Sequence, residues 1–265
     1  MLIFETRPRN GRWNMIGTWA LYRREVLRFF KISGQTFFAP IITALLFLAI
    51  FNFAFSGQGR SVDNIPFIQF LVPGLTLMAV MTASFANASF SLMFEKMVET
   101  IVDTLMPPMS PCELTAGYVL ASTTRGLLVG IAVLVGMLIF TTVKIHSITF
   151  ILFYAISASM LMSVLGLVTA IWAEKIDHVA SINNFIILPL IFLSGTFYST
   201  QHLPETFQKI AYLNPFFYLI DGFRYGFLGV HDGSLVIGIV LLITLIVFLW
   251  FSCIQLFASG YKLKS

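Results

Sequence analysis

The sequence reads LVIGIVLLITLIVFLWFSCIQLF from Leu235 to Phe257, with no Asp, Glu, Lys or Arg in the whole stretch. A helix needs about 20 consecutive apolar residues to cross the ~30 Å hydrocarbon core of a bilayer. The stretch is therefore long enough and apolar enough to span a membrane as one helix. Two lysines, Lys262 and Lys264, follow it where the chain becomes polar again.

The rest of the chain repeats this pattern. Of its 265 residues, 58% are hydrophobic and only 11% are charged, whereas soluble domains carry about 25% charged residues. The charges are bunched, and long uncharged runs separate them. We therefore expect an all-α membrane protein whose six transmembrane helices form a single domain, residues 1–265. The expected crossings are residues 37–55, 66–93, 114–142, 148–173, 180–197 and 235–257.

Residues 13–31 predict an amphipathic helix ahead of the first crossing. At 100° per residue, Trp19 and Phe30 fall on an apolar side, while Arg24 and Arg28 fall on the opposite side. A helix with aromatic residues on one face and basic residues on the other is typical of the membrane interface. We expect an interfacial helix; a soluble helix packed on a partner is the alternative.

Basic residues concentrate before the first crossing and indicate the orientation. The positive-inside rule places such a cluster in the cytoplasm. Six crossings then put both termini on the cytoplasmic side. The sequence pI of about 9.1 is explained by these residues, so we expect no nucleic-acid partner. The cluster comprises Arg7, Arg9, Arg12, Arg23, Arg24, Arg28 and Lys31.

Two connections are more than simple turns. Residues 95–111 join the second and third crossings and predict a short helix, 95–106, that Pro107 ends. Residues 199–232 join the fifth and sixth crossings and predict a re-entrant helical hairpin on the extracytoplasmic side. Its second half is apolar but too short to span, which is typical of re-entrant or interfacial segments.

Three charged residues within apolar segments are candidates for structural or functional roles. Arg125 lies inside a predicted crossing, where burial costs at least ~2.5–3.5 kcal/mol. It is a substrate or gating contact, or it pairs with Glu174, Asp177 or a helix-end carbonyl; we favour the structural pairing. Asp221 and Arg224 stand three residues apart, as helix neighbours that touch do, and we expect a structural ion pair.

No enzymatic motif is present in the sequence. The four histidines are scattered without metal-binding spacing, and no phosphate-binding Gly-x-x-x-x-Gly-Lys-Ser/Thr sequence occurs. We therefore expect no catalytic, cofactor-binding or metal-binding residues and no enzymatic activity in this chain.

The organisation of the whole chain resembles that of ABC-2-type permeases, the membrane subunits of a class of bacterial ABC exporters. One part of the resemblance lies in an ordered set of short motifs around the fifth crossing. These are LSGTF at 193–197, Leu-Pro at 203–204, LNPFFY at 213–218 and DGFR at 221–224.

The other part lies in ETIVDTLMP, residues 99–107, with Ser110 and Glu113. It resembles the cytoplasmic loop that such permeases insert into a cleft on their ATPase. The resemblance implies a coupling role for Glu95, Glu99, Thr100, Asp103, Leu105, Met106 and Pro107. It implies an extracytoplasmic gate or a structural role for Gly195, Pro204, Asn214, Pro215, Asp221 and Arg224.

The resemblance also implies partners and location. Two copies of the chain pair around a translocation path in the bacterial cytoplasmic (inner) membrane, with the lipid bilayer around them. Two separate ATP-binding cassette subunits dock below and bind ATP and Mg, so this chain needs no cofactor of its own.

The alternative is a self-sufficient secondary transporter or channel. That class usually needs intramembrane carboxylates, which the predicted crossings lack, or broken helices in two repeated halves. A membrane-embedded enzyme is a third option, which the absence of clustered His, Asp or Cys disfavours. The transported substrate (glycan, lipid, drug or other) is left open by the sequence, as is the choice between homodimer and heterodimer.

Overall fold

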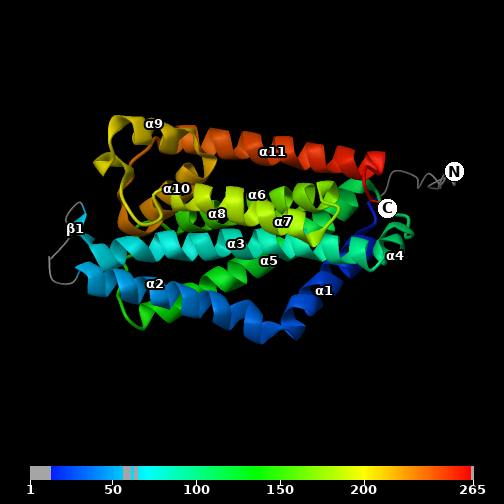
Figure 1. Ribbon diagram of the computed structural model, residues 1–265, viewed down its shortest axis with the longest axis horizontal. Coiled ribbons are helices and arrows are strands. Elements are labelled where there is room, and N and C mark those ends of the chain that lie inside the picture. The colour runs from blue at the N-terminus through cyan, green and yellow to red at the C-terminus, as the bar shows by residue number, and fades with distance from the viewer. Residues whose placement is uncertain (1–12, 56–60, 63–64, 264–265) are drawn as a thin grey trace.

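The computed structural model describes residues 13–55, 61–62 and 65–263, and over these the protein is a bundle of helices. Arg7, Arg9 and Arg12, which belong to the basic cluster expected in the cytoplasm, lie outside the described residues. The long helices run side by side along the long axis of the molecule (Figure 1). One short antiparallel hairpin, β1 (Ser61–Val62) with β2 (Ile65–Pro66), joins the first two of them.

The centre of the bundle consists of α3 (Phe67–Met97), α5 (Pro111–Leu138) and α6 (Ile148–Trp172). Along α3 most side chains are buried, from Phe70 to Glu95. Two helices lie outside this centre: α2 (Ala39–Phe55), which continues from the π-helical turn η1 (Gly34–Phe38), and α11 (Leu235–Ser259). Large apolar side chains on both helices are exposed, such as Phe53 and Val236. Exposed apolar side chains of this kind are suited to contact with the hydrocarbon core of a bilayer.

Five helical segments are long and apolar enough to cross a membrane within the described residues: Gly34–Ala54, Phe67–Met97, Pro111–Leu138, Ile148–Trp172 and Leu235–Ser259. They confirm that the chain is a helical, multi-pass membrane protein. Each overlaps a predicted crossing, with helix ends that differ by at most four residues.

The predicted crossing at 180–197 is different. The structure has a shorter helical run, Ile176–Phe192, made of α7 (Ile176–Ile182), the π-helical η3 (Asn183–Ile187) and α8 (Leu188–Phe192). At 1.5 Å per residue it is about 25 Å long, less than the ~30 Å hydrocarbon core. It stops early because the chain turns through Gly195, whose φ of 77° is left-handed.

The predicted interfacial helix is present as α1 (Met15–Lys31). Several of its apolar side chains face outward, with Trp19 63% exposed, whereas Leu21, Glu25 and Phe29 are 5%, 1% and 1% exposed. The helix therefore packs Leu21, Glu25 and Phe29 against the bundle and leaves Trp19 exposed. Its position in a membrane interface stays a prediction.

The connection at 95–111 was predicted wrongly in one respect. Glu95 does not begin a new helix, because α3 continues to Met97. The chain then turns at Glu99, whose φ of 60° lies in the left-handed region, and only the short α4 (Ile101–Leu105) follows. The helix does end before Pro107, as predicted.

Two helices lie at the end of the bundle away from α4 (Figure 1). After the 3₁₀ turn η4 (Thr200–His202), α9 (Glu205–Leu213) lies on the surface, and α10 (Pro215–Leu228) is largely buried against α3, α6 and α11. They form the predicted pair of short helices, but re-entry into the membrane stays a prediction.

Glycines let the central helices approach each other closely. A Cβ added at Gly166 of α6 would lie 2.7 Å from the carbonyl oxygen of Phe85 in α3. A backbone oxygen cannot move aside as a flexible side chain can, so the contact requires glycine. At Gly34, by contrast, an added Cβ meets nothing within 4 Å.

We expect Gly166→Ala to destabilise the protein by about 1–3 kcal/mol, because the added methyl group forces α3 and α6 apart. Gly34→Ala is the matched control and should be neutral or stabilising by about 0.5–1 kcal/mol. Equilibrium unfolding in SDS, followed by circular dichroism, measures both. Equal stability of the two variants would contradict the close packing of α3 on α6.

Candidate functional site

Two buried carboxylates and two arginines form an ion-pair network where α1 meets the bundle. Glu25 of α1 is 1% exposed and Glu95 of α3 is 7% exposed. Arg24 lies 2.5 Å from a carboxylate oxygen of Glu95 and 3.2 Å from one of Glu25. Arg28 lies 2.8 Å from the other oxygen of Glu25. Two positive and two negative charges therefore balance within this network.

Neutral donors complete the network and extend it to two more helices. The hydroxyl groups of Tyr118 in α5 and Thr104 in α4 donate to Glu95, at 2.8 and 2.7 Å. The hydroxyl of Ser91 donates to Glu25 at 2.5 Å. The result ties α1, α3, α4 and α5 to one another through buried, charge-assisted hydrogen bonds, which are stronger than neutral ones.

The seven residues predicted to couple to an ATPase divide into two groups. Glu95 belongs to the buried network, and Leu105 is half-buried against the core. The other five are exposed at the surface around α4: Glu99, Thr100, Asp103, Met106 and Pro107. We call this surface, together with Val102, the α4 surface.

The segment after α4 is attached to the start of α1. Ser110 and Glu113 form a capping box at the beginning of α5, which satisfies two backbone N–H groups that a helix start leaves free. Glu113 also accepts a hydrogen bond from the backbone N–H of Asn14, at 2.5 Å. Asn14 in turn caps α1 by accepting from Gly17. One carboxylate therefore links the first turns of α1 and α5.

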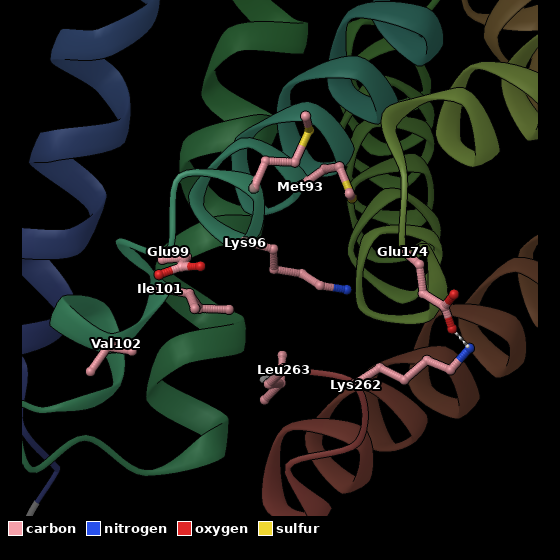
Figure 2. Close-up of a pocket in the computed structure, with 9 residues that line it drawn as sticks. Met93, Lys96, Glu99, Ile101, Val102, Glu174, Lys262 and Leu263 are labelled. Carbon is pink, nitrogen blue, oxygen red and sulfur yellow. Dashed lines mark hydrogen bonds and ion pairs between the residues drawn. The ribbon is translucent and has the colours of Figure 1, made fainter. Parts of the chain in front are cut away.

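A cavity of about 690 Å³ lies beside the α4 surface (Figure 2). Lys96 extends from α3 and donates to three carbonyl groups, of Ala170, Ile171 and Ala173, at 2.6–3.0 Å. It thereby neutralises the negative C-terminal end of α6. The cavity is lined by Met93, Lys96, Met97, Glu99, Ile101, Val102, Glu174, Lys262 and Leu263.

An ion pair holds the last described residues against the far wall of this cavity. The ammonium group of Lys262 lies 2.6 Å from a carboxylate oxygen of Glu174 (Figure 2). This hydrogen bond lowers the pKa of Glu174 and raises the pKa of Lys262. Both groups are charged at neutral pH, and the pairing is lost as the pH falls through the lowered pKa of Glu174.

At the opposite end, the predicted motif residues form a hydrogen-bonded cluster around the turn at Gly195. Asn214 caps α10 by accepting from Phe216, and its amide group donates to the carbonyl of Leu190 at 2.7 Å and to Ser194 at 2.8 Å. Pro215 occupies the first position of α10, where the missing N–H has no cost. Pro204 likewise precedes α9, as its N-cap.

The predicted ion pair between Asp221 and Arg224 is wrong. Arg224 donates instead to the carbonyl of Gly195 at 2.6 Å, and its guanidinium lies 3.9 Å from the centre of the Phe70 ring. Asp221 accepts from the backbone N–H groups of Asp232 and of the next residue, at 2.7 and 2.9 Å. Each of the two side chains is hydrogen bonded to backbone groups that the residue spacing could not identify.

The partner predicted for Arg125 is also wrong. Glu174 is engaged with Lys262, and Arg125 donates to the side-chain oxygen of Asn87 in α3 at 3.1 Å. Asn87 donates to the hydroxyl of Ser122 at 2.9 Å. The sequence gives no signal for Asn87 as the partner. The predicted partners are carboxylates or carbonyl groups near helix ends, whereas this neutral amide lies inside a predicted crossing.

We expect Glu95→Gln to destabilise the protein by about 1–3 kcal/mol, because it removes the charge of a buried carboxylate that pairs with the half-exposed Arg24. Glu99→Gln, the same change at an exposed position four residues on, should stay within about 0.5 kcal/mol of the wild type. The midpoint of thermal unfolding in detergent measures both. A Glu95→Gln protein as stable as Glu99→Gln would show that the network does not anchor α1 to α3.

Comparison with known proteins identifies the family of the chain. A family model described as ABC-2 type transporter matches residues 17–228. The inner membrane transport permease YadH of Escherichia coli is 35% identical over 246 residues, covering 93% of this chain and 96% of that protein. Nodulation protein J of Sinorhizobium fredii is 26% identical over 219 residues, covering 80% of each chain. The chain belongs to the ABC-2 type transporter family.

Proposed function

We propose that this chain is the transmembrane permease subunit of an ABC exporter in the bacterial cytoplasmic (inner) membrane. Two copies form the translocation path, and separate ATP-binding cassette subunits drive it. The observation that carries the proposal is the α4 surface, an exposed segment built on the buried ion-pair network. The printed name of the YadH relative, an inner membrane transport permease, supports the same class of function.

The α4 surface suits a docked ATPase because it offers both charge and apolar contact. Asp103 and Glu99 are exposed beside Val102 and Met106, which are 38% and 66% exposed. Protein interfaces combine an apolar centre with a polar rim in this way.

The network beneath the α4 surface gives the ATPase a mechanical connection to the membrane helices. Thr104 of α4 is hydrogen bonded to Glu95 of α3 and to Arg24 of α1. A displacement of α4 therefore acts on both helices at once. ATP binding and hydrolysis in the ATPase bias the inward- and outward-open states, since its nucleotide states bind the α4 surface with different affinity.

The end of the bundle that carries α4 faces the cytoplasm in this proposal. The beginning of α1 and the end of α11 lie at this same end (Figure 1), so both termini are cytoplasmic. Basic residues there, including Arg23, Lys175 and Lys262, agree with the positive-inside rule. The helices α9 and α10 then lie at the extracytoplasmic exit, where Gly195, Asn214 and Arg224 shape a gate or brace it.

The helical run Ile176–Phe192 is the fifth of the six crossings in this proposal. A short apolar helix crosses by thinning the bilayer locally or by associating with other helices. Phe185 and Ile186 on this run are 80% and 51% exposed, which supports contact with lipid or with the second copy.

ATP and Mg are bound by the ATPase subunits in this proposal. This chain has no phosphate-binding motif of its own.

The test is co-purification with a candidate ATP-binding cassette ATPase in nanodiscs, followed by ATPase assays. We expect Asp103→Arg and Met106→Glu to reduce ATPase binding at least tenfold, because each places an unfavourable charge in the docked surface. Glu205→Arg is the matched control. It reverses an exposed acidic residue at the other end of the bundle, so the ATPase should bind as it does to the wild type.

Equal effects of Asp103→Arg and Glu205→Arg would contradict the assignment of the α4 surface. A purified chain that transports without any ATPase would support the secondary transporter or channel instead. Gel filtration and circular dichroism establish that each variant is folded.

A further inference from the structure

An apolar groove of about 540 Å³ opens between α2 and α3. Figure 1 shows α2 diverging from α3 toward its start near α1. The groove is separate from the cavity beside the α4 surface and shares no lining residue with it. Its walls carry mostly small and apolar side chains, among them Pro40, Ala79, Ala83, Ala86 and Phe90. The space is therefore suited to hydrocarbon chains.

Arg125 of α5 is the only charged side chain among the described residues that line the groove. Its hydrogen bond to Asn87 is to a neutral amide, and Asn87 continues to Ser122, also neutral. The Nε atom of Arg125 is buried and has no hydrogen-bond partner among the described residues. Its hydrogen-bonded neighbours are neutral and do not offset the positive charge of the guanidinium, and its Nε donor has no partner in the described part of the chain.

The nearby carboxylates are already engaged. Glu25 holds Arg24 and Arg28, and Glu95 holds Arg24. Because these two carboxylates pair with Arg24 and Arg28, Arg125 has no ion pair with a carboxylate among the described residues. A buried charge without a counter-ion is unfavourable, so an anion in the groove would stabilise the structure.

The depth of Arg125 favours an anion that arrives with an apolar chain. It follows Tyr118, a member of the ion-pair network, by two turns of α5, which is about 10 Å at 1.5 Å per residue. Its neighbour Thr124 is hydrogen bonded to Tyr22 of α1 at 3.1 Å. The guanidinium of Arg125 therefore lies farther from the α4 end of the bundle than the network does. It is still alongside α1 and beside a groove whose walls are apolar.

We infer that the groove binds an anionic lipid of the bilayer, with its phosphate group on Arg125 and its acyl chains along α2 and α3. Charge complementarity selects the headgroup, and the alanine-rich walls accommodate the chains. This site goes beyond the proposed function, because it requires no ATPase.

The test counts lipids retained by the full-length chain, extracted from vesicles of phosphatidylcholine and phosphatidylglycerol, by native mass spectrometry. We expect the wild type to retain one more phosphatidylglycerol per chain than Arg125→Gln, with binding at least about tenfold weaker in the variant. Arg125→Lys should retain most of the binding. Arg23→Gln, which removes an exposed arginine of α1, is the matched control and should behave as the wild type.

A second variant tests the groove and keeps the charge. Ala86→Leu narrows the wall and should weaken phosphatidylglycerol retention, even if Arg125→Gln does not fold. Dodecyl phosphate should displace the lipid from the wild type, whereas inorganic phosphate at the same concentration should not.

Three results would overturn the inference. The first is equal retention of phosphatidylglycerol by Arg125→Gln and the wild type. The second is retention of phosphatidylcholine by the wild type equal to its retention of phosphatidylglycerol. The third is displacement of the lipid by inorganic phosphate as effective as displacement by dodecyl phosphate. A groove occupied by a second copy of the chain would exclude the lipid and give the first result. None of these results affects ATPase co-purification, so failure here is distinguishable from failure of the proposed function.

Discussion

Two carboxylates, Glu25 and Glu95, are buried where α1 crosses the bundle, and removing each from water costs several kcal/mol unless it is paired. Arg24 and Arg28 supply the pairing only if α1 lies against α3 and α5 with its charged side inward. The position of α1, and the outward direction of Trp19, are consequences of this requirement. Because Thr104 of α4 completes the same network, the position of α4 follows from it as well.

The cytoplasmic and extracytoplasmic ends proposed for the molecule are built by different means. At the α4 end, charged side chains meet one another and connect four helices. At the other end, Asp221 and Arg224 meet backbone groups, and the contacts stabilise turns. The first arrangement connects four helices to one another, whereas the second holds the chain that surrounds Gly195 in one conformation.

The sequence predicted the long helices well, because an uncharged run of about 20 residues has few alternatives to spanning a bilayer. It predicted the extent of the connections less well. The left-handed turn at Glu99 is unusual for a residue other than glycine, so no residue type signalled it. The partners of Arg125 and Arg224 were missed for one reason: Asn87 and a backbone carbonyl carry no charge. Of the predicted coupling residues, burial separated Glu95 from its exposed neighbours, which spacing alone could not do.

The inward-facing charges of α1 also constrain the order in which the protein is assembled. Synthesis produces α1 before its partners, because Glu95, Thr104 and Tyr118 appear only about 70 to 95 residues later in the chain. Until then, water or lipid headgroups must solvate its arginines, and in the predicted interfacial position its exposed Trp19 attaches to the membrane surface. The helix is thus the first described part of the protein that can attach to the bilayer, yet it cannot complete its own contacts until α5 has been made.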